Sequence, residues 1–148
     1  MRRFSGQVNG KVDDKGRIIL PAKFREGLDP DDKEVFVAAK GLTGCVAIYT
    51  KGRWGLILER FDSAPWAQPE ALRVSRVLAS QAEDAPHDKQ GRMRIPQPLL
   101  DQAGIKREVT IIGANNRIEV WAQEKWQEYL EESEKLFEKD APRLFTQS

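Results

Sequence analysis

A short basic motif occurs twice in the chain, and its residue types suit the binding of an anionic partner. Residues 13–21 read DDKGRIILP and residues 88–96 read DKQGRMRIP, so both copies contain Asp-x-x-Gly-Arg, three further residues and Pro. The glycine can take the positive φ that a tight turn requires. The carboxylate can accept hydrogen bonds from backbone N–H groups of the turn or from the guanidinium four residues later. A guanidinium is a planar fork that fits a phosphate or the edge of a guanine.

Two interpretations of a single copy of this motif stay open. Asp-x-x-Gly-Arg is a stable turn in its own right, in which the arginine would only be paired to its aspartate. Two copies beside further cations favour a contact with double-stranded DNA, because a hairpin or β-ribbon can enter a major groove. We therefore predict that DNA is bound by Lys15, Arg17, Lys23, Arg25, Lys89, Arg92 and Arg94, and that the turns are shaped by Asp13, Gly16, Asp88 and Gly91.

Charge is unevenly distributed along the chain, although the net charge of the whole is only +1. Residues 1–25 carry seven basic and two acidic side chains, which makes this region +5. Residues 124–140 carry seven acidic and three basic side chains, which makes this region −4. The acidic segment is either a solvated helix face or a contact for a basic patch on a neighbouring subunit.

The two halves of the chain are similar well beyond the basic motif. The ordered matches continue from Glu34-Val35 with Glu108-Val109 to the aromatic pairs Tyr49/Trp54 and Trp121/Trp126. Such a series indicates an internal duplication. A half of about 45–50 residues buries little core alone, so the two should interlock. We expect a β-rich α+β fold with one pseudo-symmetric, barrel-like core and short flanking helices.

Each half predicts the same order of elements. A short strand enters the turn and a second strand leaves it. This second strand is expected at 17–20 in the first half and at 92–95 in the second. A brief helix follows, with Pro at its start and Gly after its end, at 21–27 and 96–104. Two strands then form a hairpin, and the expected pairs are 34–39 with 45–49 and 108–112 with 117–121.

These elements divide the chain into two units and a linker. The first unit spans 1–60 with its core at 7–54. The linker spans 61–82 and consists of a loop at 62–69 and a helix at 70–82. The second unit spans 83–148 with its core at 83–126, and its acidic helix at 124–140 is expected to be limited by Pro142.

Several function classes receive no support from the residues. One cysteine, Cys45, and one histidine, His87, provide neither a disulfide framework nor a multi-cysteine zinc site, so we expect no metal or cofactor. The pair His87-Asp88 has no nucleophile at a recognisable spacing, and we expect His87 to be exposed and inert. Cys45 is expected to be a buried strand residue. The segment 41–44 lacks the Lys-Ser/Thr of a phosphate loop. Taken together, these observations lead us to expect no enzyme.

The N-terminus lacks the apolar stretch of a secretory signal, and no apolar run approaches the length of a membrane span. We therefore expect a cytoplasmic protein with no membrane partner and no small-molecule substrate.

The segments VDDKGRIILPAKFREGL and HDKQGRMRIP resemble the MraZ family of bacterial transcription regulators, which are built from two AbrB-like (SpoVT-AbrB) swapped-hairpin units. The family's paired Asp-x-x-x-Arg signature is matched by Asp13/Arg17 and Asp88/Arg92, and its Pro-Ala-x-Phe/Tyr-Arg segment by residues 21–25. The aromatic pair that closes each half is matched too. The resemblance covers about residues 4–140.

The resemblance implies a duplicated AbrB-like swapped-hairpin β-barrel with pseudo-twofold symmetry. It also implies a nucleoid-associated regulator that binds short direct repeats upstream of the division and cell-wall gene cluster and assembles into a ring. The implied DNA contacts are Arg17 and Arg92. The chain departs from the pattern at Arg2 and Arg3, which could add a phosphate contact, and at Pro98, which lies in the first turn of a short helix.

A structural or protein-binding AbrB-like module without specific DNA readout is the alternative. Antitoxin-like relatives of this fold pair one unit with a long disordered tail. Only six residues follow Pro142, and this argues against that alternative.

Overall fold

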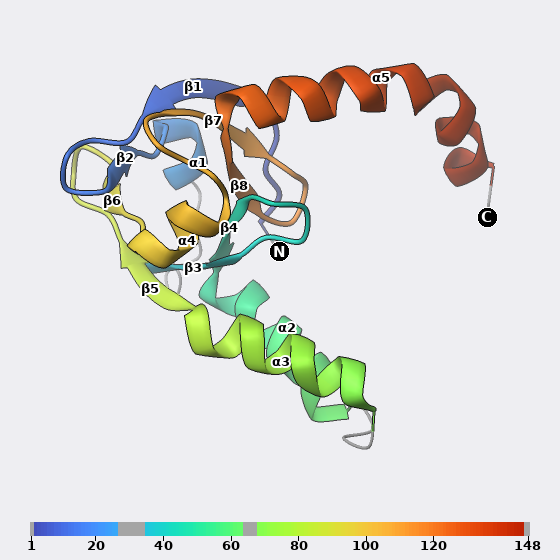
Figure 1. Cartoon of the computed structure of the whole chain (residues 1–148), viewed down its shortest axis with the longest axis horizontal. Helices are drawn as coiled ribbons and strands as arrows, with labels where there is room; N and C mark the ends of the chain where they lie inside the picture. The colour runs from blue at the N-terminus through green and yellow to red at the C-terminus, as the bar shows by residue number, and fades with distance from the viewer. Residues whose placement is uncertain (1, 27–34, 64–67, 147–148) are drawn as a thin grey trace.

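The computed structural model describes residues 2–26, 35–63 and 68–146. These residues form an α+β fold in which a six-stranded antiparallel sheet is joined by a two-stranded ribbon and helices (Figure 1). The strands are β1 (Gln7–Lys11), β2 (Arg17–Ile19), β3 (Val35–Lys40), β4 (Val46–Thr50), β5 (Glu83–Pro86), β6 (Arg92–Arg94), β7 (Glu108–Gly113) and β8 (Ile118–Ala122). The helices are α1 (Ala22–Arg25), α2 (Lys51–Ser63), α3 (Pro69–Gln81), α4 (Gln97–Gln102) and α5 (Gln123–Phe145).

The two halves of the chain exchange strands. The order of the sheet is β1-β7-β8-β4-β3-β5, which reads the same in reverse when each strand is replaced by its counterpart in the other half. Strand β1 of the first half pairs with β7 of the second, and β5 of the second half pairs with β3 of the first. Strands β2 and β6 form the separate ribbon. Neither half therefore has a complete sheet without the other.

One hydrophobic cluster receives side chains from both halves. Ile18 and Met93 face each other at the middle of the ribbon, and both are almost fully buried. Phe24 of α1 and Leu99 of α4 occupy equivalent positions in the two halves and belong to the same cluster. Because side chains alternate between the faces of a strand, burial of Ile18 and Met93 turns their neighbours outward.

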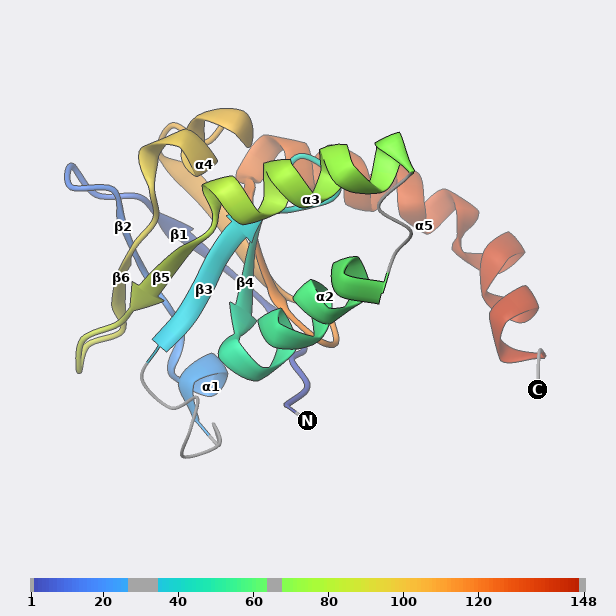
Figure 2. The same ribbon diagram turned by 90° about the horizontal axis from the view of Figure 1, so that it is seen from below.

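Aromatic pairs attach the helices α2 and α5 to the sheet. The rings of Tyr49 and Trp54 stack at 5.8 Å between centroids, and those of Trp121 and Trp126 lie 5.3 Å apart. Trp54 and Trp126 are both partly buried and pack against clusters of buried residues. The helices α2 and α3 lie together on one side of the sheet, while α5 extends away from the body (Figures 1 and 2).

Two expectations from the sequence are wrong. The last helix does not end at Pro142 but continues to Phe145, and it bends near its C-terminal end (Figure 1). Proline removes one N–H donor, yet Thr146 N–H donates to the carbonyl of Pro142 at 3.0 Å, so the helical bonding resumes. His87 is half-buried rather than exposed, because it bridges to Met93 and its ring lies 5.9 Å from that of Phe36.

The remaining predicted elements agree with the observed ones to within a few residues. The linker helix expected at 70–82 is α3, Pro69–Gln81. Parts of three expectations lie outside the described residues, namely Gly27 after the first short helix, Glu34 at the start of a strand, and positions 64–67 of the loop.

Candidate nucleic-acid interface

The first Asp-x-x-Gly-Arg motif forms a tight turn closed by its own aspartate. Oδ1 of Asp13 accepts hydrogen bonds from the backbone N–H groups of Lys15 and Arg17, both at 2.9 Å. Oδ2 accepts from Nε of Arg17 at 2.8 Å. The backbone N–H of Gly16, whose φ is +77°, donates to the carbonyl of Asp13 at 3.0 Å. One carboxylate therefore fixes both the turn and the arginine side chain.

The second motif repeats this geometry bond for bond. Oδ1 of Asp88 accepts from the N–H groups of Gln90 and Arg92 at 2.9 Å, and Oδ2 accepts from Nε of Arg92 at 2.6 Å. Gly91 has a φ of +85°, and its N–H donates to the carbonyl of Asp88 at 3.0 Å. Each turn glycine also accepts a hydrogen bond from the other half of the chain. The carbonyl of Gly16 accepts from Ile95 N–H at 2.9 Å, and the carbonyl of Gly91 accepts from Leu20 N–H at 2.7 Å.

The ribbon between the turns presents three arginines to solvent. In its register Arg17 lies opposite Arg94, and Ile19 lies opposite Arg92. Ile19 is 63% exposed even though it is a large apolar residue. The turns project from the same side of the molecule, one at each end of the ribbon (Figures 1 and 2). Arg17 and Arg92 are partly exposed, with 32% and 43% of the side-chain surface accessible.

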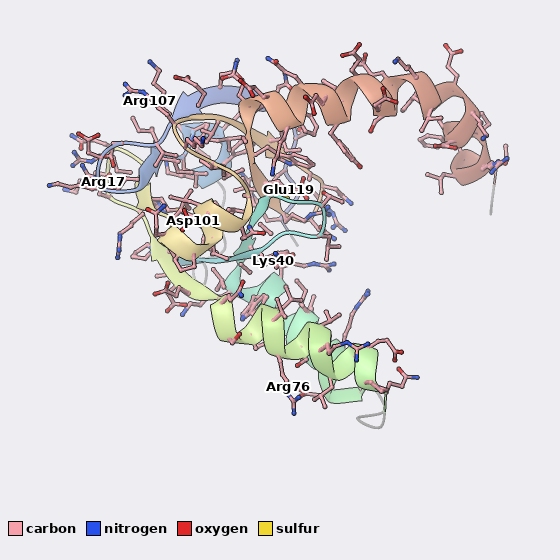
Figure 3. The ribbon with its side chains drawn as sticks, viewed as in Figure 1. Arg17, Lys40, Arg76, Asp101, Arg107 and Glu119 are labelled. Atoms are coloured by element: carbon pink, nitrogen blue, oxygen red, sulfur yellow. The ribbon has the colours of Figure 1, made fainter. Side chains whose placement is uncertain are left out.

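A groove of about 690 Å³ runs beside the ribbon and adds two cations to the surface. Arg17 and Arg92 both line it, and so do Lys11 and Arg107. Figure 3 shows Arg107 on the same side of the molecule as Arg17. Arg107 is brought there by strand exchange, since its carbonyl accepts from Val12 N–H at 2.8 Å. Sequence reasoning missed both residues, and only the cluster of positive charge in residues 1–25 pointed to Lys11.

The other predicted DNA-binding residues fall into two groups. Lys15 and Lys89 are exposed within the two turns. Lys23 and Arg25 lie on α1, which only Leu20 and Pro21 separate from β2, and both side chains contact other residues of the chain. Nζ of Lys23 lies 5.2 Å from the ring centroid of Phe24, while Nε of Arg25 donates to the carbonyl of Leu20 at 3.0 Å.

Hydrogen bonds lower the pKa of both turn aspartates. For Asp13 the largest cause is the backbone N–H of Arg17, whereas for Asp88 it is the guanidinium of Arg92, which lowers the pKa from 3.8 to about 2. A carboxyl group whose pKa is lowered on folding stabilises the fold at any pH above its ordinary pKa. This stabilisation is lost as the pH falls through the pKa of the folded state. For Asp88 this window runs from about pH 4 down to about pH 2, so its turn stays closed at neutral pH.

The different causes predict different responses to mutation. In a carboxyl-detected NMR titration, Arg92→Ala should raise the pKa of Asp88 well toward 3.8, because the largest stabilising bond is lost. Arg17→Ala should leave the pKa of Asp13 below its ordinary value, because the backbone N–H of residue 17 is still there. An equal rise at both sites would contradict the assigned hydrogen bonds.

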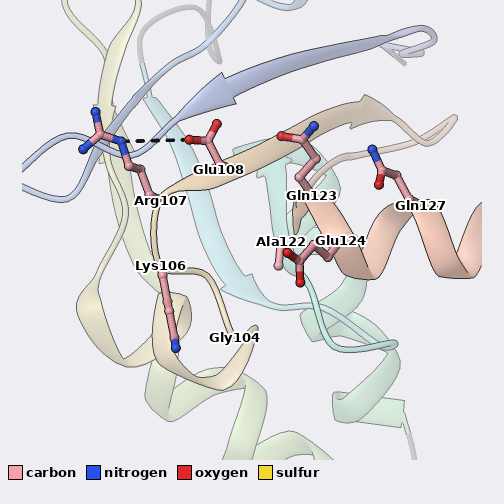
Figure 4. Close-up of a pocket in the computed structure, with 8 residues that line it drawn as sticks. All are labelled: Gly104, Lys106, Arg107, Glu108, Ala122, Gln123, Glu124 and Gln127. Carbon is pink, nitrogen blue, oxygen red and sulfur yellow. Dashed lines mark ion pairs between the residues drawn. The ribbon is translucent and has the colours of Figure 1, made fainter.

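Other parts of the described structure offer weaker sites. A cavity of about 680 Å³ beside the start of α5 is lined by charges of both signs, among them Arg107 and Glu108 (Figure 4). Burial raises the pKa of the Cys45 thiol to about 12, which makes it a poor nucleophile. The described residues contain no cluster of three or more His, Cys, Asp or Glu side chains that could hold a metal ion. In the same residues, no helix combines the length and apolarity needed to cross a bilayer.

The chain is similar to known proteins over almost its whole length. Residues 3–77 and 78–147 each match the model of a family described as "MraZ protein, putative antitoxin-like". The chain belongs to the MraZ family. It is 39% identical over 141 residues to the transcriptional regulator MraZ of Natranaerobius thermophilus, a match that covers 95% of this chain and 96% of the relative. It is 37% identical, with the same coverage, to the transcriptional regulator MraZ of Heliobacterium modesticaldum. Membership of the MraZ family supports a role in the regulation of transcription.

Proposed function

We propose that this protein is a sequence-specific DNA-binding regulator of transcription that reads the major groove with the ribbon β2–β6 and its two turns. The observation that carries the proposal is the pair of equivalent turns, in each of which an aspartate orients an outward arginine at one end of an exposed ribbon. A two-stranded ribbon fits a major groove, which is about 12 Å wide. Arg17 and Arg92 are offset by two residues in the register, or about 7 Å along the strands, so one groove can hold both.

Each side chain of this surface has a distinct proposed role. The arginines of the turns donate to guanine edges, while Lys15 and Lys89 contact phosphates and set the register of the protein on the duplex. Ile19, exposed between arginines, suits the methyl group of thymine. Lys11 and Arg107 extend the positive surface along the groove beside the ribbon.

We also propose the swapped-hairpin barrel of AbrB-like units for the core. The exchange of β1 and β5 between the halves and the reversible strand order support it. The proposed units are 1–60 and 83–148, with the helical linker 61–82 between them. This arrangement makes the two turns parts of one rigid core, which fixes their separation before DNA is met.

Self-association into a ring is proposed because the helices expose large apolar side chains. On α5 these are Leu136, Phe137, Leu144 and Phe145, and on α2 and α3 they are Leu56, Leu58, Leu72, Val74 and Val77. Covering them in a neighbouring subunit would remove apolar surface from water. Several linked ribbons would then bind direct repeats far more tightly than one, provided that the repeat spacing fits the ring.

The proposed targets are direct repeats upstream of the division and cell-wall gene cluster, bound in the cytoplasm at the nucleoid. The test is a titration of that upstream duplex and of a scrambled duplex at two salt concentrations, with sedimentation of the same samples to count protomers. Affinity for the upstream duplex should exceed that for the scrambled one by about 10³ or more. It should fall steeply with salt, by a logarithmic slope of about 0.9 for each phosphate contacted. Equal affinity for both duplexes, or no dependence on salt, would contradict the proposal.

A further inference from the structure

Arg25, a cation of the first half, is bound to the turn of the second half. Its Nη1 donates to the carbonyl of Lys89 at 3.4 Å, across 64 positions of sequence, and its Nε donates to the carbonyl of Leu20 at 3.0 Å. The side chain is partly buried. Two of the guanidinium's N–H donors therefore bind carbonyl groups of the chain itself.

The guanidinium also packs directly against Gly91. A Cβ atom at that glycine would lie 2.9 Å from Nε and 3.0 Å from Cζ of Arg25. The carbonyl of Gly91 in turn accepts from the N–H of Leu20 at 2.7 Å, so Arg25 and Leu20 hold neighbouring parts of the same turn. The next residue along the chain is Arg92, one of the two arginines proposed to read DNA.

The other half of the molecule provides an internal comparison. The residue that corresponds to Arg25 is Leu100, which is 2% exposed and belongs to the hydrophobic core. Its Cδ1 would lie 4.0 Å from a Cβ at Gly16, so it packs beneath the first turn as Arg25 packs beneath the second. Equivalent positions in both halves thus support a turn, once through apolar contact and once through hydrogen bonds.

We propose that Arg25 is a positioning residue that holds the second turn for Arg92, and that it makes no phosphate contact of its own. The proposal rests on the function proposed above and reassigns one of the residues predicted from the sequence to bind DNA. It also gives the strand exchange a functional consequence. A helix of the first half sets the geometry of the arginine that the second half presents.

A double-mutant cycle separates positioning from direct contact. Arg25→Leu introduces the residue of the equivalent position and is measured alone, with Lys15→Ala and with Arg92→Ala, using the upstream duplex at low salt. A positioning residue should weaken binding about tenfold alone and with Lys15→Ala, but less than about twofold with Arg92→Ala, because residues that act through one another are not additive. An equal loss in all three backgrounds, with the salt slope reduced by about 0.9, would identify a phosphate contact and overturn the proposal.

Hydrogen exchange on the DNA-free protein gives a readout that does not depend on binding. Arg25→Leu should speed amide exchange in residues 88–92 and leave residues 13–17 unchanged, with the thermal unfolding transition retained. Arg25→Lys keeps the charge but loses the planar fork, so it should give the same pattern even if the leucine variant folds poorly. Unchanged exchange at 88–92 in both variants would overturn the proposal. If exchange responds as expected but the wild-type protein binds no duplex, the proposed function fails and the positioning of the turn stands.

Discussion

Arg17→Ala is expected to abolish specific DNA binding while fold and assembly are retained. The side chain is partly exposed, and its Nε is held by Asp13 at 2.8 Å, so the terminal amino groups are oriented before DNA arrives. A bidentate contact with a guanine discriminates by about 1–3 kcal/mol. In the proposed ring, several linked protomers would lose this contact at once, which would multiply the effect. Fluorescence anisotropy with the upstream and scrambled duplexes should show that the difference between them disappears.

Two further variants make this result interpretable. Arg92→Ala should act in the same direction, because Arg92 is held by Asp88 in the equivalent turn of the second half. Arg76→Ala removes the same charge from α3, away from Arg17, and should leave specific binding unchanged (Figure 3). Circular dichroism and sedimentation check that all three variants fold and assemble. Normal operator binding by Arg17→Ala would show that the contact is wrongly assigned.

Gly91→Ala is expected to destabilise the protein by about 3 kcal/mol, through strain and a steric clash together. The φ of Gly91 is +85°, a conformation that costs an alanine about 1 kcal/mol. The added Cβ would also lie 2.6 Å from the carbonyl oxygen of Leu20, a backbone atom that cannot move without breaking the bond to the turn. Urea unfolding measures the loss of free energy.

Gly16→Ala is the matched control for this prediction. Its φ is +77°, but the nearest atom to an added Cβ would be the carbonyl oxygen of Ile95 at 3.5 Å, an ordinary contact. Only the strain then applies, and the variant should lose about 1 kcal/mol. Equal losses in the two variants would mean that the second turn can shift away from Leu20. DNA binding should be weaker in Gly91→Ala than in Gly16→Ala, since only the former displaces the backbone beside its arginine.

The turns could be predicted from the sequence because every bond that closes them is local. Asp13 and Arg17 are four positions apart, and the residues between them include the glycine that permits the turn. The same local rules gave the short helices after Pro21 and Pro96. Pro142 shows the limit of such rules, because a helix whose bonding resumes after a proline can continue past it.

The two hairpins, β3 with β4 and β7 with β8, were predicted from the sequence. The strand pairs between the halves could not be predicted, because they join residues far apart in the chain. The partner of β1 is β7, about 100 positions later, and this pairing brings Arg107 to the groove beside Arg17. The hydrogen bond from Arg25 to the carbonyl of Lys89 could not be predicted from the sequence either. Both placements follow from burial of apolar side chains of two halves in a single core.

The sequence by itself thus determined the two turns, their aspartate–arginine pairs and the duplication, since these depend on contacts within a few residues. Only the tertiary structure decided which cations share the surface of the ribbon and which support it from within. The reason is that a charged side chain takes its role from its neighbours in space. In this protein those neighbours come from the opposite half of the chain.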